Sequence, residues 1–518
     1  MSSGVASMFT GRRAMRLNLG RDDDDDETIP MNVRRPAGVL RSTGAVWADR
    51  LRGAPTARTV SGMDVRLPPG PRLPNLLQAL LALAAPVVLF PAAAKRYGVP
   101  FTLTMLPQRR KIVAVAEPEQ VKDVFAGSPS VFHAGKGNDL LRPLLGEQSL
   151  LLQDGDEHAR ARRLLAPAFG RREIAGYRGL VEEVTAQQLD RWPRSGRVRA
   201  HVLLNELTLE VILRVVFGVT DSARLDHMRP IVARAVDAGP VVMIGLGIPA
   251  LRGIGPWKRE VDDLAAIHEF LGEEIELARH DPDLAERRDL LALLVRASAD
   301  DAQGLSDAEL RDQLMTLVAA GHETTATAMA WAMLELARHP GVQQRCVDEM
   351  AAGAMAADGA DSDSPTHTAG DARSAVGETE YLDAVIKEVL RLHPVVPMVM
   401  RELQEPATVG GRDYPRGVTI SPSIVLAHRA DEAYPSPQDF DPRRFLGDVP
   451  TPTTWLPFGG GARRCIGASF ALMEGQVILQ QVLGRYRLVP VGRGREWPRS
   501  RNVTLYPWRR ARVELRPR

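Results

Sequence analysis

A glycine-rich stretch with a single cysteine, FGGGARRCIG at residues 458–467, constrains this chain more than any other part of its sequence. The glycines allow the backbone to approach a bound group closely, the amides after Cys465 stabilise a negative sulfur, and Arg463 supplies a cation. A thiolate that ligates haem iron needs these properties. Only one other cysteine is present, Cys346, which excludes a zinc or iron–sulfur site built from several cysteines. The alternative is a turn before a helix, with Cys465 an inert buried thiol.

The stretch fits the pattern F-x-x-G-x-R-x-C-x-G, so it resembles the haem-binding signature of the cytochrome P450 family of haem-thiolate monooxygenases. The resemblance implies that Cys465 is the axial ligand of the iron in haem b, which is iron protoporphyrin IX. It also implies that Phe458 and Gly467, at the two ends of the signature, belong to the cofactor-binding loop.

The composition and net charge exclude some classes of function. The 518 residues are 44% hydrophobic and 25% charged, which is ordinary for a globular protein with a substantial core. The formal net charge of +2 gives no field that would recruit nucleic acid. Two cysteines provide no disulfide framework, and this favours the cytoplasm as the location.

Two regions are expected along the chain. Residues 1–62 contain an acidic run, Asp22 to Asp26, and lack helical or strand periodicity, which predicts a disordered N-terminal extension. The resemblance begins just after Met63, so we assign residues 63–518 to a cytochrome P450 haem-thiolate catalytic domain.

The apolar run Ala79 to Ala94 is too short to span a bilayer and contains Pro86 and Pro91. It predicts a packed first helix, with a peripheral membrane contact as the alternative. Residues 100–105 and 112–115 read as strands. Helical periodicity prevails from about residue 118 to 350, which makes the chain mainly α with a small β portion. The resemblance implies the cytochrome P450 fold, with the haem between a long central helix and the cysteine loop.

That long helix is predicted from Ser306 to about Arg338, because SDAE at 306–309 forms a capping box and HPG follows at 339–341. Residues 350–378 are rich in small and polar side chains and predict an exposed loop. A further helix is predicted from Ala468 to Leu483, ending at Gly484.

The long helix contains AAGHETT at 319–325, where Gly321 and paired threonines predict a local bulge that opens a groove. The stretch resembles the family's oxygen-activation motif. This implies that Glu323 and Thr324 lie over the distal face of the haem and supply protons to bound dioxygen. The alternative is a kinked helix with Thr324 bonded to its own backbone and Glu323 at the surface.

Glu388 and Arg391 are three residues apart in a segment of helical periodicity, and an exposed ion pair is the ordinary explanation. The pair also resembles the family's E-x-x-R motif, which implies a buried network. PRRF at 442–445 resembles the P-E-R-F element and nominates Arg444 as the third member. Arg443 replaces the commoner acid, a departure that puts local surface pairing in doubt.

His158 and Arg162 are four residues apart, so they share one face of a predicted helix. The resemblance implies that both reach the haem propionates, together with Arg401 and Arg463. Taken singly, each arginine is as well explained as a solvated surface residue.

The resemblance implies a monooxygenase that inserts one atom of O2 into a hydrophobic small molecule, by hydroxylation or epoxidation. Its two electrons come from an external ferredoxin or flavodoxin with an NAD(P)H-dependent reductase. Two alternatives remain, a peroxide-driven haem-thiolate peroxygenase and a non-catalytic haem- or ligand-binding protein. The expected substrate pocket is mostly apolar and comprises Val318, Ala319, Ala320, Val395, Val396 and Met398. The resemblance adds Val503 and Thr504 of a C-terminal hairpin.

Overall fold

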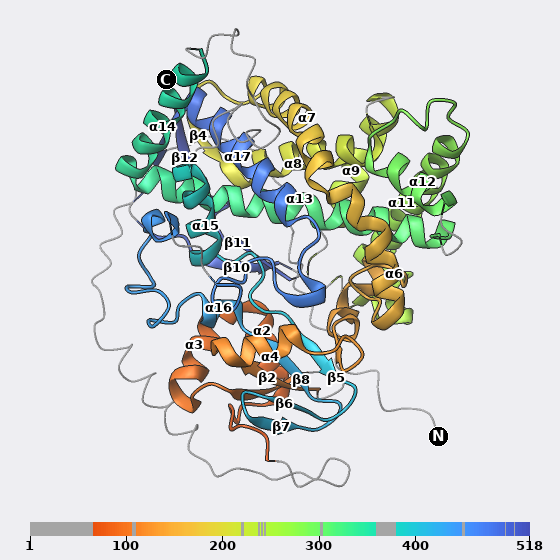
Figure 1. The fold of residues 1–518 in the computed structure, drawn as a ribbon, viewed down its shortest axis with the longest axis vertical. Helices are drawn as coiled ribbons and strands as arrows, with labels where there is room; N and C mark the ends of the chain where they lie inside the picture. Colours follow the sequence, from red (N-terminus) through yellow and green to blue (C-terminus); the bar gives the residue numbers. More distant parts are fainter. Residues whose placement is uncertain are drawn as a thin grey trace, which may run out of the picture. The chain divides into compact units, whose positions relative to one another are not determined.

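The computed structural model describes residues 66–518, except 106–109, 219–221, 237–238, 240–241, 243–244, 301–303, 359–379, 448–450, 493 and 502. The extension expected over residues 1–62 lies outside the described residues, as does most of the loop expected over 350–378. The described part is mainly α with small sheets, as the sequence predicts (Figure 1).

The helices carry the labels of Figure 1. They are α2 (Asn75–Ala84), α3 (Pro86–Tyr97), α4 (Pro118–Ala126), α5 (Arg142–Leu145), α6 (Gly155–Leu165), α7 (Arg171–Asp190), α8 (Ala200–Phe217), α9 (Ser222–Val236), α11 (Gly255–Arg279), α12 (Leu290–Asp300), α13 (Asp307–Arg338), α14 (Pro340–Asp358), α15 (Glu380–Leu392), α16 (Ile424–Ala427) and α17 (Ala468–Arg485). The strands are β1 (Phe101–Met105), β2 (Arg110–Val115), β3 (Phe132–His133), β4 (Gly196–Arg199), β5 (Arg401–Leu403), β6 (Ala407–Val409), β7 (Arg412–Tyr414), β8 (Thr419–Pro422), β9 (Tyr486–Pro490), β10 (Pro498–Arg501), β11 (Thr504–Pro507) and β12 (Arg512–Pro517).

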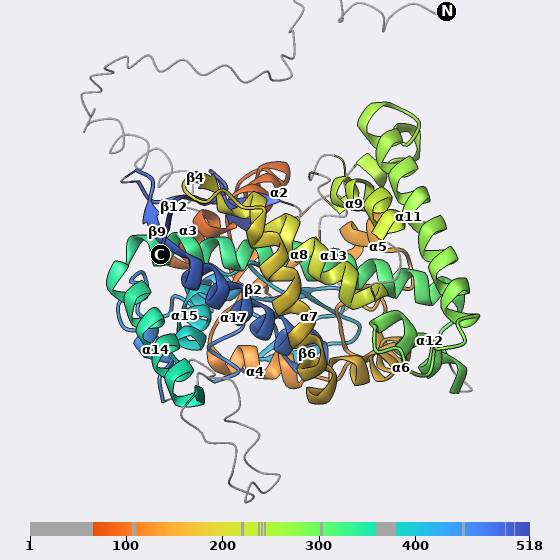
Figure 2. The ribbon, with the colours of Figure 1, turned by 90° about the horizontal axis from the view of Figure 1, so that it is seen from above.

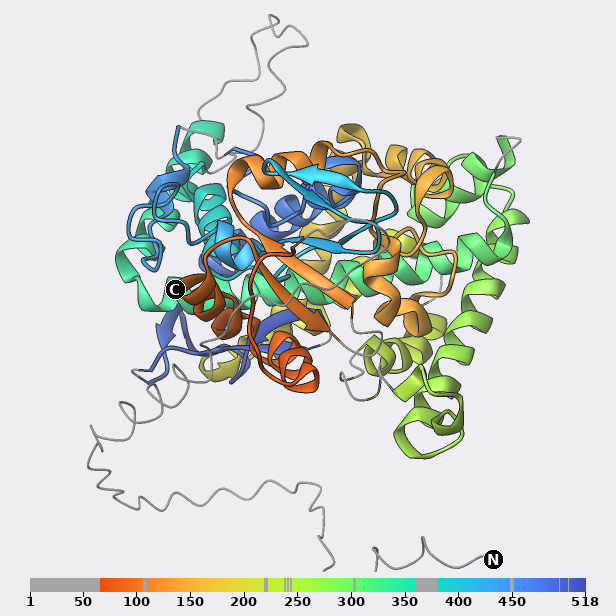
Figure 3. The ribbon, with the colours of Figure 1, turned by 90° about the horizontal axis from the view of Figure 1, so that it is seen from below.

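The largest sheet joins strands from both ends of the chain in the order β1-β2-β8-β5-β3, with β2 and β8 parallel. Figure 3 shows its orange strands, near residue 100, beside cyan strands near residue 400. Because successive side chains of a strand point to opposite faces, Phe101 and Leu103 pack with Phe90 of α3 on one side. Val113 and Val115 pack with Val124 of α4 on the other. The strands expected at residues 100–105 and 112–115 are therefore confirmed.

Helix α13 is the axis of the helical part, and α8 and α17 lie against it (Figures 1 and 2). The predicted capping box is present, with the Ser306 hydroxyl accepting from the backbone N–H of Glu309, and the helix ends at Arg338 as predicted. The predicted bulge is wrong, because α13 is α-helical without interruption. Gly321 instead permits close packing, since a Cβ there would lie 2.7 Å from Ile212 of α8.

Three other boundaries differ from the sequence-based expectations. The run Ala79 to Ala94 forms two helices, because Pro86 begins α3, and Pro91 is accommodated inside it. Helix α14 continues to Asp358, into the region expected to be a loop. Helix α17 passes through Gly484 and ends at Arg485. None of the helices in the described residues is both long and apolar enough to cross a membrane.

A buried carboxyl lies where α17 packs on α13. Glu474 is 1% exposed and forms a hydrogen bond with Thr325, whereas its Oε2 has no hydrogen-bond partner. Burial raises the pKa of Glu474 to about 8, and the bond to Thr325 lowers it only in part. The folded protein therefore keeps a proton that the unfolded chain has already released near neutral pH.

We expect Glu474→Gln to remove part of the pH dependence of unfolding. Stability from the protonated carboxyl is fully present below the unfolded pKa of about 4.5 and is lost as pH rises to about 8. The variant should gain up to about 5 kcal/mol over the wild type between these limits. Denaturant unfolding at acidic and mildly alkaline pH measures this, with the exposed Glu157→Gln as control. A difference that is equal at both pH values contradicts the prediction.

Candidate functional site

The loop around Cys465 passes very close to α4. Gly460 and Gly461 have no room for a side chain, since a Cβ at either would lie 2.1 Å from atoms of Phe125. Gly459 and Gly461 also have φ values of 64°, a region that other residues rarely adopt. The N–H of Cys465 donates to the carbonyl of Phe458 over 2.9 Å, which closes the loop just before Gly467, where α17 begins.

Cys465 is exposed, yet the protein around its sulfur desolvates the thiol. Desolvation raises the pKa of Cys465, while a backbone hydrogen bond from Gly467 and the charges of Arg162 and Arg464 lower it. The amide and cations stabilise a thiolate, and a bound metal cation would supply the remaining stabilisation.

Four basic side chains from three parts of the chain lie together near Cys465. They are His158 and Arg162 of α6, Arg401 of β5 and Arg463 of the cysteine loop. Burial, Arg463 and Arg162 lower the pKa of His158 to about 4, so its imidazole is neutral at pH 7. Burial and the charge of Arg463 lower the pKa of Arg401 to about 10. The cluster therefore holds more positive charge than its surroundings neutralise.

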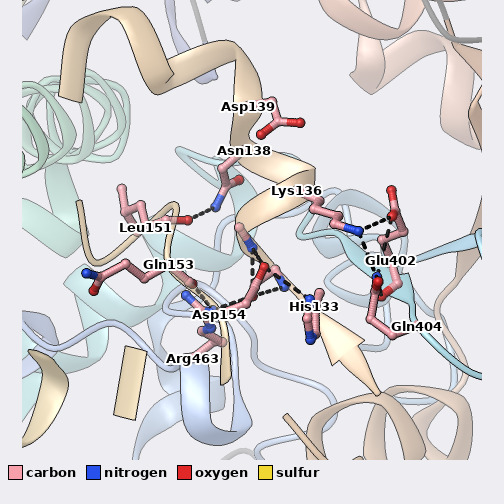
Figure 4. Close-up of polar contacts among 12 residues, drawn as sticks. His133, Lys136, Asn138, Asp139, Leu151, Gln153, Asp154, Glu402, Gln404 and Arg463 are labelled. Atoms are coloured by element: carbon pink, nitrogen blue, oxygen red, sulfur yellow. Dashed lines mark hydrogen bonds and ion pairs between the residues drawn. The ribbon is translucent and has the colours of Figure 1, made fainter. Parts of the chain in front are cut away.

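Asp154, immediately before α6, is the acid of this cluster, and sequence reasoning missed it. Its carboxylate accepts from the backbone N–H of Ala134 at 2.8 Å and of Gly135 at 3.0 Å, and from Arg463 at 2.5 Å (Figure 4). Arg463 also donates to the carbonyls of Leu150, over 3.0 Å, and Gln153. One carboxylate against three arginines leaves a net positive site that fits two further carboxylates, such as haem propionates.

One face of α13 is open in the middle of a buried helix. Ala320 is exposed and Ala319, Gly321 and Thr324 are half-buried, whereas both flanking stretches, 312–318 and 325–337, are buried. Val395, Val396 and Met398 are half-buried, and Val503 is 39% exposed. Val318 differs from the other expected pocket residues, since it is 3% exposed and packs in the main core.

Glu323 and Thr324 have different surroundings. Glu323 is 6% exposed, so the alternative that placed it at the surface is wrong. The Thr504 hydroxyl donates to its Oε1 over 2.9 Å, and burial raises the pKa of Glu323 to about 7. The Thr324 hydroxyl donates to the carbonyl of Ala320, one turn earlier on the open face, over 2.7 Å.

Glu388 and Arg391 form a fully buried pair, each 0% exposed. The guanidinium donates to both carboxylate oxygens, with Nε–Oε2 at 2.6 Å and Nη2–Oε1 at 2.8 Å. Arg391 also donates to three backbone carbonyls, those of His428, Pro437 and Asp439.

The third predicted member, Arg444, places its Nε 3.5 Å from Glu388 Oε1 and donates to the carbonyl of Ser436. The neighbouring Arg443 is exposed and pairs with Asp441 at 2.8 Å, so local surface pairing exists without the usual acid.

His428, which sequence reasoning also missed, connects this network to the cysteine loop. Its Nδ1 lies 3.1 Å from the carbonyl of Arg391, and its Nε2 accepts from the backbone N–H of Leu456 over 2.7 Å. Burial lowers the pKa of His428 to about 3, so the ring is neutral and keeps one nitrogen as an acceptor. Leu456 begins the approach to residues 458–467, so the ion pair and the cysteine loop are parts of one structure.

Cys465 offers a single protein ligand, so the site suits a metal whose other ligands belong to a cofactor. Among the described residues, no group of three or more histidine, cysteine or acidic side chains could hold a bare metal ion. A single thiol, a cluster of cations and an open apolar helix face together fit an iron porphyrin.

Comparisons with known proteins agree with this geometry. The family model described as Cytochrome P450 matches residues 67–511. The putative cytochrome P450 135A1 of Mycobacterium tuberculosis is 39% identical over 458 residues, which cover 88% of this chain and 97% of the relative. The putative cytochrome P450 135B1 of Mycobacterium bovis is 42% identical over 450 residues, covering 87% and 91%.

Solved structures give the same result. A cyanobacterial CYP120A1 with retinoic acid bound superposes with a TM-score of 0.74 at 25% identity, covering 88% of this chain and 100% of that one. The haem domain of cytochrome P450DA superposes with a TM-score of 0.72 at 25% identity, covering 87% and 98%.

Proposed function

Because the chain belongs to the cytochrome P450 family and is therefore a haem-dependent monooxygenase, we propose that Cys465 is the axial thiolate ligand of its haem b. The observation that carries this proposal is the exposed Cys465, whose sulfur is flanked by a backbone amide and two arginines. Phe458 and Gly467 delimit the loop that holds it. Residues 63–518 then form the catalytic domain.

The basic cluster is proposed to bind the two propionates. Burial and the neighbouring positive charges lower the pKa values of Arg162, Arg401 and Arg463, so the site holds uncompensated positive charge beside the neutral His158. Two incoming carboxylates would neutralise this charge and accept charge-assisted hydrogen bonds. Arg463 is held in place because it donates to the Asp154 carboxylate and to the carbonyl of Leu150.

When bound, the haem supplies the activation of dioxygen, which delivers one oxygen atom to substrate and releases the other as water at the expense of two electrons. We propose that Glu323 and Thr324 manage the protons for this reaction. Glu323 has a pKa of about 7, so it can both hold and release a proton near neutral pH. Thr324 presents its hydroxyl on the open face of α13, where it can pass a proton onward.

The proposed substrate is a hydrophobic small molecule that is hydroxylated or epoxidised. Ala319 and Ala320 offer small side chains on the open helix face, and Val395, Val396, Met398 and Val503 add apolar surface. Val318 is buried in the core, so we expect it to support the pocket wall without contacting the substrate. The similarity to a CYP120A1 that binds retinoic acid, a largely apolar molecule, supports this substrate class.

We propose that the two electrons arrive from a ferredoxin or flavodoxin with an NAD(P)H-dependent reductase in the cytoplasm. Arg464 follows Arg463 on the cysteine loop and is exposed, so it offers a positive contact to an acidic partner near the sulfur. Neither a peroxide-driven enzyme nor a non-catalytic haem protein needs a proton donor at Glu323 and Thr324. Turnover with dioxygen and reductant therefore distinguishes the proposal from both alternatives.

We expect Thr324→Ala to consume reductant at a rate similar to the wild type but to release a several-fold larger share of the electrons as hydrogen peroxide. Without the hydroxyl on the open face, proton delivery to bound oxygen is less well directed. Product and peroxide are measured together in a reconstituted system with a hydrophobic substrate.

The neighbouring Thr325→Ala is the matched control, because Thr325 is 4% exposed and bonds to Glu474 rather than lying on the open face. It should lower stability but leave the share of peroxide unchanged. Equal peroxide from Thr324→Ala and the wild type would contradict the proposed role of Thr324.

A further inference from the structure

The carboxyl of Glu323 is held by the C-terminal hairpin and not by its own helix. Thr504 begins β11 and donates to Glu323 Oε1 over 2.9 Å. Arg501 ends β10, pairs with Thr504 in the hairpin register, and places its Nε 3.7 Å from the same oxygen. The hairpin therefore presents one hydroxyl and one cation to the acid.

This hairpin is itself firmly attached. The indole N–H of Trp331, on α13, donates to the carbonyl of Leu505 over 3.2 Å. The backbone N–H of Leu505 donates to the carbonyl of Val395 over 2.8 Å. Tyr506 stacks on His201 of α8, with ring centroids 5.4 Å apart. Thr504 thus lies beside anchored neighbours on the same strand, which fixes its hydroxyl relative to Glu323.

The Thr504 hydroxyl has two acceptors for its single proton. Its oxygen lies 2.9 Å from Glu323 Oε1 and 2.9 Å from the carbonyl oxygen of Arg501. When Glu323 is ionised, the hydroxyl can donate to the carboxylate. When Glu323 is protonated, the carboxyl can donate to Thr504, which then donates to the Arg501 carbonyl. Both protonation states of the acid therefore find a hydrogen-bond partner in the same place.

Arg501 and burial act on Glu323 in opposite directions. Burial raises the pKa of Glu323 to about 7, and the bond from Thr504 lowers it in part. The guanidinium of Arg501, with its Nε 3.7 Å from Oε1, is placed to favour the carboxylate by its charge. Arg501 is itself only partly accessible, with 14% of its side chain exposed, so solvent screens its charge weakly.

The two histidines near Glu323 do not change their protonation state near neutral pH. Burial lowers the pKa of His322 on α13 to about 4 and that of His201 on α8 to about 3, so both rings are neutral. His201 also feels the positive charges of Arg501 and Arg510. Tyr506 is the remaining ionisable side chain of β11. Glu323 is therefore the group whose charge changes as the pH passes through 7.

We propose that Thr504 and Arg501 are positioning residues for proton delivery, which hold the Glu323 carboxyl inside the protein and support both of its protonation states. The inference rests on the proposed role of Glu323 as a proton donor. When Glu323 gives up its proton, the Thr504 hydroxyl turns from the Arg501 carbonyl to the carboxylate. Arg501 stabilises the new negative charge until a proton from solvent replaces the one released.

The test uses the haem-loaded full-length chain with Thr504→Val, which removes the hydroxyl at nearly constant shape, Thr504→Ser, which keeps it, and Arg501→Gln. The C=O stretch of the protonated Glu323 carboxyl is followed by infrared difference spectroscopy across the pH range and assigned by its loss in Glu323→Gln. We expect the pKa of Glu323 to rise by about one unit or more in Thr504→Val and Arg501→Gln, because each removes a group that favours the carboxylate. Thr504→Ser should titrate like the wild type.

The share of electrons released as peroxide is the second measurement. It should rise several-fold in Thr504→Val and stay unchanged in Thr504→Ser and in Ser500→Ala, a control on the same hairpin. If Thr504→Val does not fold, Arg501→Gln carries the test through the infrared titration alone. An unchanged Glu323 pKa in Arg501→Gln, or in a folded Thr504→Val, overturns the inference. If Glu323→Gln itself releases no additional peroxide, the proposed role of Glu323 is wrong instead.

Discussion

Replacing Glu388 by alanine is expected to leave the purified protein almost without haem. The substitution strands the guanidinium of Arg391, which is 0% exposed and would lose both hydrogen bonds to the carboxylate. Removing one partner of a fully buried ion pair costs about 3–5 kcal/mol. A loss of this size is a large fraction of the stability of an ordinary protein.

The reason that haem is lost, and not only stability, is the connection between the ion pair and the cysteine loop. Arg391 bonds to the segment 428–439, and His428 accepts from Leu456, two residues before the loop begins. An Arg391 without its carboxylate partner would therefore disturb the segment that leads into the Cys465 loop.

The ratio of haem to protein after purification measures this effect, with Arg443→Ala as the matched control. Arg443 lies in the same network region, but its side chain is 72% exposed and pairs only with Asp441. Its loss should cost well under 1 kcal/mol, as for other surface pairs, and leave haem content normal. Normal haem content in Glu388→Ala would show that the buried pair does not support the cofactor site.

Replacing Cys465 by alanine is expected to reduce monooxygenase turnover at least about a hundredfold, even when haem is bound. With haem bound, the Cys465 thiolate would hold the iron and supply the electron density that dioxygen activation requires. No other side chain of the loop at 458–467 can replace it, because the loop has no second cysteine or histidine. Product formation per bound haem, with reductant and dioxygen supplied, measures the change.

Cys346→Ala is the control for Cys465→Ala. Cys346 is 0% exposed, and burial raises its pKa to about 12, so it is an uncharged thiol in the core. Its replacement should lower stability slightly and leave turnover per haem unchanged. Substantial turnover by Cys465→Ala, at a level near that of Cys346→Ala, would mean that the reaction does not depend on the proposed ligand.

Local patterns predicted the elements of this protein well because the forces that form them act over a few residues. The capping box at Ser306, the buried strands near residue 113 and the helical spacing of Glu388 and Arg391 were all readable without a structure. The bulge at Gly321 was not, since a glycine in a helix is equally explained by a bulge and by a close neighbour. The neighbour, Ile212, belongs to another helix.

The partners of the site residues could not be predicted, because they come from distant parts of the chain. Asp154 bonds to Arg463 across 309 residues, and Thr504 bonds to Glu323 across 181. Neither Asp154 nor Thr504 belongs to a recognisable motif. An acid directly before the predicted helix of His158 and Arg162 was the one available signal for Asp154, and its meaning depends on knowing where Arg463 lies.

The visible absorption spectrum of the reduced, carbon monoxide-bound protein tests the assignment of Cys465 most directly. The haem-loaded wild type and Cys346→Ala are expected to show the long-wavelength Soret band that thiolate ligation produces, and Cys465→Ala is expected to lack it. A thiolate-type band that persists in Cys465→Ala would contradict the central claim, because the sulfur on the iron would then come from another residue.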